Sequence, residues 1–139
     1  MSDTSLRDLF GTHGNCALVT LKRDGRPQIS TVSYAYDRGR DLIRVSVTAD
    51  RAKTANLGRD PRASVYVTGN SGWAYAVAEA RAELMPTAAA PDDASVEELI
   101  DIYRAVGGEH SDWDDYRRAM VQDKRVPLLL HVERVYGVA

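Results

Sequence analysis

Apolar and polar residues alternate along most of the chain, which is the period of a strand with one buried face. The dipeptide Asp24-Gly25 lies between the first two alternating segments and is a strong signal for a tight hairpin. The segments that alternate cover residues 16–22, 28–36, 42–48, 63–68, 73–84 and 126–138. Six strands joined by short turns predict an antiparallel β-barrel with peripheral helices, not a parallel sheet.

The segment 73–84 allows two interpretations. Its alanines and glutamates are good helix formers. Its residues nevertheless alternate without interruption, with alanines along one face, and they show no helical stripe. We therefore favour a strand, whose alanine face would let another backbone or a flat ligand approach closely.

Four segments have the capping signals and periodicity of helices, and residues 69–72 predict a loop. Asp50 is the expected N-cap of the second helix, which Gly58 would end. Ser95 and Glu98 resemble a capping box, and Ser111 is the expected cap of the last helix. The expected helices are a short one before Gly11 and three more over residues 50–58, 95–106 and 112–122.

Length and composition set further limits. The 139 residues correspond to a single domain over residues 1–139. The single cysteine, Cys16, excludes an internal disulfide framework and a thiolate-rich zinc site, and its apolar neighbours predict a small buried side chain. No apolar run approaches the roughly 20 residues that cross a bilayer. We therefore expect a soluble, cytoplasmic protein with no membrane partner.

Charge is unevenly distributed although the net charge is only −2. Residues 38–62 contain seven basic side chains and three acidic ones, whereas residues 91–115 contain nine acidic side chains and one basic one. A local basic cluster on a mildly acidic chain favours a small anionic ligand over a nucleic acid, which needs a broader basic surface.

The candidate site with the clearest chemistry lies where the third strand is expected to lead into a helix. It comprises Ser46, Arg51, Lys53, Thr54 and Asn56. Free N–H groups at a helix start favour an anion, and the arginine and lysine would add charge-assisted hydrogen bonds to it. The alternative is a solvated basic turn.

Two aromatic residues, Trp73 and Tyr75, follow the expected loop. Such residues stack on ring systems or anchor subunit interfaces, but they also pack in ordinary cores.

Other constellations are weaker. His110, Asp112 and Asp114 could be drawn as a metal site, but acidic residues in the first turn of a helix explain them better. The sequence has neither a nucleophile elbow nor the residue order of a Ser/His/Asp hydrolase. Any group-transfer or redox chemistry is therefore expected to come from a bound cofactor.

Several motifs occur together in an order that resembles a known family. They are DGRPQ at 24–28, RAKTANL at 51–57, DPRAS at 60–64, GWAYAVAE at 72–79, GEHSDWDDYR at 108–117 and VYG at 135–137. This order resembles the split-barrel flavin and deazaflavin oxidoreductases related to pyridoxamine 5′-phosphate oxidase. Within that group it is most similar to the reductases that depend on coenzyme F420.

The resemblance implies a six-stranded antiparallel split β-barrel of the FMN-binding type. It also implies a homodimer with two cofactor clefts at the subunit interface. In such proteins the basic strand-to-helix segment holds the cofactor phosphate. Lys53 and Arg51 would contact that phosphate, with Ser46, Thr54 and Asn56 nearby.

The same resemblance places two further segments near the cofactor. Ser30, Thr31 and Val32 correspond to the strand that lies along the ring. Trp73 and Ala74 correspond to the segment that approaches the cofactor, either within the subunit or from its partner.

The activity implied is hydride transfer from reduced F420 to a conjugated, electron-poor small molecule of the quinone, enone or tetrapyrrole type. Alternatives are an FMN-binding oxidase or flavin reductase on the same barrel, and a non-catalytic F420 carrier. No side chain is identified as catalytic. Residues 130–135 do not have the Arg-x-His order with which pyridoxamine phosphate oxidases bind substrate phosphate, which argues against vitamin B6 oxidation.

Overall fold

The computed structural model describes residues 2–69 and 72–139. Its strands are β1 (His13–Leu21), β2 (Pro27–Asp37), β3 (Leu42–Thr48), β4 (Arg62–Thr68), β5 (Tyr75–Leu84) and β6 (Arg125–Val138). Its helices are α1 (Asp3–Asp8), α2 (Ala52–Arg59), α3 (Ala94–Gly107) and α4 (Trp113–Gln122). Two positions of the expected loop at 69–72, Asn70 and Ser71, lie outside the described residues.

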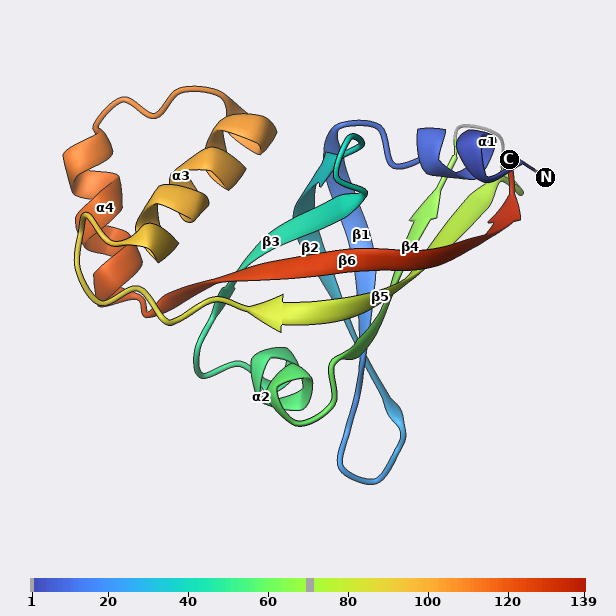
Figure 1. The fold of residues 1–139 in the computed structure, drawn as a ribbon, viewed down its shortest axis with the longest axis horizontal. Coiled ribbons are helices and arrows are strands. Elements are labelled where there is room, and N and C mark those ends of the chain that lie inside the picture. The colour runs from blue at the N-terminus through green and yellow to red at the C-terminus, as the bar shows by residue number, and fades with distance from the viewer. Residues whose placement is uncertain (1, 70–71) are drawn as a thin grey trace.

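The six strands close into an antiparallel barrel in the order β1-β2-β3-β6-β5-β4, with β4 returning to β1 (Figure 1). This confirms the predicted fold class. The alanine-rich segment is a strand, β5, and its alanines alternate into the barrel interior, where Ala76 and Ala78 are fully buried. The strand alternation therefore outweighs helix propensity here, because burial of one face stabilises the strand.

The barrel is loosely joined between β2 and β3. Their pairing extends only from Ala35↔Arg44 to Asp37↔Leu42. Beyond these pairs β2 remains bonded to β1 as far as Pro27, and β3 remains bonded to β6 as far as Thr48. The two strands therefore separate, and the split lies next to α2.

Side chains from all six strands fill the barrel. Leu18, Ile43, Val65 and Leu128 are completely buried. Cys16 belongs to the same core, and burial raises the pKa of its thiol to about 12, so the thiolate is not formed at neutral pH. The prediction of a small buried side chain at Cys16 is confirmed.

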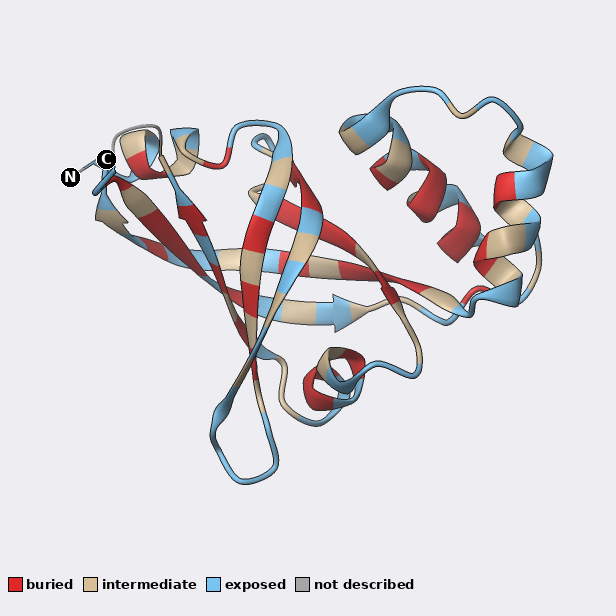
Figure 2. Ribbon diagram, turned by 180° about the vertical axis from the view of Figure 1, so that it is seen from behind, coloured by how far each residue is buried: buried red, intermediate tan, exposed pale blue. Residues whose placement is uncertain are grey.

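Helices α3 and α4 pack against each other beside the barrel (Figures 1 and 2). Their shared core includes Val96, Leu99 and Tyr116, and buried residues line the inner side of both helices. Arg44 of β3 attaches this pair to the barrel, because its Nη1 lies 3.4 Å from a Glu98 carboxylate oxygen and 3.2 Å from one of Asp101. None of the helices that the structure describes is long and apolar enough to cross a membrane.

The capping predictions were wrong at three helices. Helix α2 has Arg51 at its N-cap position, without a side-chain cap, and not Asp50. Asp93 caps α3 by accepting from the Val96 N–H, whereas Ser95 lies inside the helix and donates its hydroxyl to the Pro86 carbonyl oxygen. A carboxylate accepts hydrogen bonds from free N–H groups more strongly than a hydroxyl does, which favours the aspartate.

Similarly, Asp112 and not Ser111 caps α4, accepting from the Asp115 N–H. Gly58 lies within α2, which ends one residue later at Arg59.

Candidate functional site

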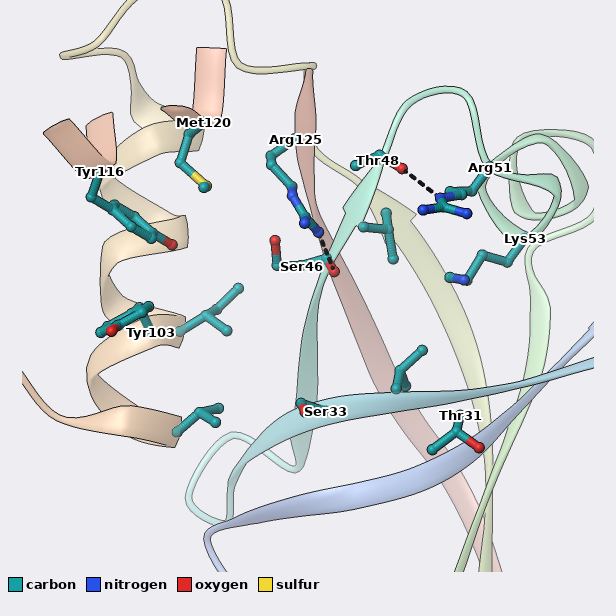
Figure 3. Close-up of a pocket in the computed structure, with 14 residues that line it drawn as sticks. Thr31, Ser33, Ser46, Thr48, Arg51, Lys53, Tyr103, Tyr116, Met120 and Arg125 are labelled. Atoms are coloured by element: carbon teal, nitrogen blue, oxygen red, sulfur yellow. Dashed lines mark hydrogen bonds between the residues drawn. The ribbon is translucent and has the colours of Figure 1, made fainter. Parts of the chain in front are cut away.

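A pocket of about 550 Å³ lies at the split between β2 and β3, between the barrel and the two helices α3 and α4 (Figure 3). The barrel and α2 contribute Thr31, Val32, Ser33, Ser46, Val47, Thr48, Arg51, Lys53 and Arg125 to its lining. The helices contribute Ile102, Tyr103, Val106, Tyr116 and Met120. The described lining thus combines three cations with an apolar, aromatic wall and contains no carboxylate.

The strand β2 presents an unpaired backbone edge to this pocket. Tyr36 donates its N–H to Thr12 on the β1 side. Because successive residues of a strand direct their N–H and C=O groups to opposite sides, the groups of Thr31 and Ser33 face the side of β3. No strand pairing covers them within the part of the chain that the structure describes. Unpaired N–H and C=O groups along a strand edge can pair with another molecule, so this exposed edge suits a ligand with donors and acceptors on its rim.

The start of α2 forms the cationic end of the pocket. The Arg51 side chain donates from Nε to the Thr48 hydroxyl at 3.2 Å, and no side chain caps the helix. Lys53 is half-buried and lines the pocket from the first turn. The uncapped N–H groups carry the positive end of the helix dipole, so both charges and dipole favour an anion at this point.

The basic cluster seen in the sequence divides into two groups in the structure. Four of its seven members are in ion pairs with carboxylates away from the pocket, namely Arg38, Arg40, Arg44 and Arg62. Arg59 donates to the Leu21 carbonyl oxygen. Arg51 and Lys53 are the two members that line the pocket. Neither forms an ion pair with any residue that the structure describes. The part of the basic cluster that lines the pocket is therefore much smaller than the sequence suggests.

The structure brings together five of the ten residues identified from the sequence. Thr31, Val32, Ser46, Arg51 and Lys53 all line the pocket.

The other five lie elsewhere in the described structure. Thr54 donates its hydroxyl to the Thr48 carbonyl oxygen at 2.7 Å, and Asn56 donates to the Thr20 hydroxyl at 3.1 Å, so both hold α2 against the barrel. Ser30 has a buried hydroxyl without a partner in the described chain. Ala74 is buried, whereas Trp73 is 91% exposed. A role for these residues in cofactor binding stays a prediction.

Sequence reasoning missed Arg125 and the aromatic wall. Arg125 is the first residue of β6, and its side chain points into the pocket near Ser46 (Figure 3). Tyr103 and Tyr116 approach from the other side, with ring centroids 5.0 Å apart. Local sequence carries no signal for these contacts, because they depend on how α3 and α4 pack against the barrel.

No group of three potential metal ligands occurs among the residues that the structure describes. Asp112 accepts the Asp115 N–H as a helix cap, and its own N–H donates to His110 Nδ1 at 2.9 Å. The helix-capping interpretation of these residues is therefore the one that the geometry supports.

Fold and site together define a class: small split β-barrels with a cationic cleft beside the separated strands. Comparison of sequences specifies the class further. The chain belongs to the pyridoxamine 5′-phosphate oxidase family, whose N-terminal domain pattern matches residues 2–139. The resemblance noted from the motifs is thereby confirmed at the level of family and fold.

Solved structures share this fold at low sequence identity. A protein described as an F420 reductase is 21% identical with a TM-score of 0.62, and the match covers 88% of each chain. A conserved hypothetical protein from Mycobacterium tuberculosis is 23% identical with a TM-score of 0.72, over 99% of this chain and 84% of that one. A FAD-binding protein from Mesorhizobium loti is 19% identical with a TM-score of 0.69, over 99% and 92%.

Proposed function

We propose that this protein is an oxidoreductase that binds coenzyme F420 in the pocket and reduces a conjugated, electron-poor small molecule. The observation that carries the proposal is the uncapped start of α2, where Arg51 and Lys53 face a pocket without a carboxylate in its described lining. The family and the likeness to an F420 reductase support it.

The residues present are well suited to such a cofactor. Arg51 and Lys53 would bind its phosphate together with the first-turn N–H groups of α2. The unpaired backbone of Thr31 and Ser33 would bind the rim of the ring, and Val32 would lie along it. An anionic ligand would gain charge-assisted hydrogen bonds from both side chains, which a neutral or cationic ligand would not.

Bound F420 would supply the hydride, and the protein would position the acceptor and exclude water. A proton must also be delivered to the reduced acceptor. Tyr116 is unsuited to deliver it, because its hydroxyl donates to the Leu99 carbonyl oxygen and burial raises its pKa to about 12. Of the two tyrosines that line the pocket, Tyr103 is therefore the better proton donor, and water is the alternative source.

We further propose that two copies of the chain form a homodimer. The outer face of β4, β5 and β6 carries a row of apolar side chains, because Val77 is paired with Tyr66 on one side and Tyr136 on the other. Tyr66 is 40% exposed and Tyr136 is 43% exposed. An exposed apolar sheet face of this kind is typical of a subunit interface. The highly exposed Trp73 would then reach the partner subunit.

The dimer is tested by sedimentation equilibrium. We expect a mass of twice 15.3 kDa. Replacing Tyr66 and Tyr136 together with serine is expected to shift the protein toward the monomer, because it removes apolar area from the centre of the row. A wild-type mass of one chain would contradict the proposal.

The cofactor is tested by titrating the purified protein with F420 and with FMN under the same conditions. We expect saturable F420 binding, weaker FMN binding, and turnover of at least one quinone or enone with reduced F420. Tighter binding of FMN would instead support the alternative of a flavin oxidase or flavin reductase. The structural similarity to a FAD-binding protein is consistent with that alternative. F420 binding without turnover of any quinone, enone or tetrapyrrole would support a carrier.

A further inference from the structure

The guanidinium of Arg125 has few partners among the residues that the structure describes. Its one hydrogen bond, from Nη1 to the Ser46 carbonyl oxygen, is long at 3.5 Å (Figure 3). Its Nε is buried and has no acceptor among the described residues. A desolvated N–H of a charged group is unfavourable without an acceptor, so an acceptor from outside the chain is expected.

Other arginines with little exposure have carboxylate partners. Arg7 donates two hydrogen bonds to Asp41, at 3.0 and 2.8 Å. Arg44 also has a buried Nε without a partner, but Glu98 and Asp101 compensate its charge. No carboxylate lies in the described lining around Arg125. Unlike the charges of Arg7 and Arg44, the positive charge of Arg125 is therefore left for a ligand to compensate.

The surroundings of Arg125 indicate the shape of that ligand. Tyr103, Tyr116 and Met120 face it from α3 and α4 (Figure 3). The two tyrosine rings are inclined at 64° and present an aromatic corner. Such a surface favours a flat, apolar body over a hydrated polar one.

We propose that Arg125 is a second anion subsite, which binds a carboxylate of the substrate while the planar part of the substrate packs on Tyr103 and Tyr116. The inference rests on the proposed function in taking this ligand to be the substrate. Arg51 and Lys53 lie on the other side of the pocket and remain available to the cofactor phosphate (Figure 3). The preferred acceptors are then planar conjugated acids, not neutral quinones.

The test uses two probes of equal shape, 2-naphthoate and neutral 2-naphthamide, titrated calorimetrically into the protein without cofactor. Wild-type protein is expected to bind the carboxylate about tenfold or more tightly than the amide, as a charge-assisted hydrogen bond implies. Arg125→Gln is expected to abolish this preference without changing the affinity for the amide. The matched control Arg23→Gln, at an exposed turn position, is expected to behave as the wild type.

Three results would overturn the subsite. They are no preference in the wild type, a preference that persists in Arg125→Gln, and a preference lost only when Arg51 and Lys53 are replaced. If Arg125→Gln weakens F420 binding and not naphthoate binding, the group bound there is a carboxylate of the cofactor and the proposal also fails.

If Arg125→Gln does not fold, Arg125→Lys provides the test. Lysine keeps the charge but lacks the paired N–H groups, so naphthoate affinity is expected to fall severalfold. Unchanged affinity would contradict the subsite. Wild-type protein that prefers naphthoate but does not bind F420 would refute the proposed cofactor and leave the Arg125 subsite standing.

Discussion

Replacing Arg51 and Lys53 together with alanine is expected to weaken F420 binding by about 3 kcal/mol or more, which is at least about 100-fold in Kd. Lys53→Ala alone is expected to cost about 1.5–3 kcal/mol, the range for a hydrogen bond to a charged group. Both side chains line the pocket from the start of α2, and the described lining contains no carboxylate that would already neutralise their charges. Equilibrium titration by F420 fluorescence measures the change.

The matched control is Lys22→Ala, which removes an exposed lysine at the end of β1, outside the pocket lining. This variant is expected to bind F420 as the wild type does. The double variant should also keep the thermal stability of the wild type within a few degrees, because neither side chain forms an ion pair among the described residues. An unchanged Kd in the double variant would show that the phosphate lies elsewhere.

Truncating Leu128 to alanine is expected to lower the free energy of unfolding by about 2–5 kcal/mol, the cost of a cavity at a fully buried leucine. Leu128 is 0% exposed and is paired with Val45 on one side and Leu84 on the other. Since a domain of this size has about 5–15 kcal/mol of stability, this is a large fraction of the total. Urea unfolding followed by circular dichroism measures the difference.

The adjacent residue Leu129 provides the control. It points to the opposite face of β6 and is only partly buried. Leu129→Ala is therefore expected to cost less than half as much as Leu128→Ala. Equal costs, or a larger cost at Leu129, would mean that β6 is paired one residue out of the register described here, because a slip of one residue exchanges the two faces.

Much of the fold was predictable because its signals are local. Alternation located all six strands, and the Asp24-Gly25 turn predicted the first hairpin. The position of β6 between β3 and β5 was not predictable from periodicity, since it depends on pairs such as Val45↔Leu128 that are far apart in the chain. The separation of β2 from β3, which opens the pocket, depends on the same non-local pairing.

The sequence predicted that polar side chains would cap the helices α3 and α4, but not which residue would be the cap. Near α3 both Asp93 and Ser95 can accept backbone hydrogen bonds, and the sequence does not show which one the chain geometry selects. The structure shows that Asp93 also accepts from the Ala89 and Ala90 N–H groups, so one carboxylate stabilises the turn and the helix together. Ser95 is thereby left inside the helix.

For the site, the sequence predicted the cationic end and missed the opposite side. Arg51 and Lys53 follow directly after a strand and begin a helix, a local pattern with a known physical preference for anions. Arg125 contacts the carbonyl oxygen of Ser46, a residue far away in the chain. Thr54 and Asn56 were candidates because of their polarity, but in the structure their side chains bond to the barrel.

The most direct test of the central claim is a crystal structure of the protein soaked with F420. The account predicts the cofactor phosphate at the start of α2, with oxygens about 2.7–2.9 Å from Arg51 and Lys53 nitrogens, as in charge-assisted hydrogen bonds. It also predicts the ring against Thr31 and Val32 of β2. A cofactor bound in another part of the molecule, with only solvent between Arg51 and Lys53, would contradict it.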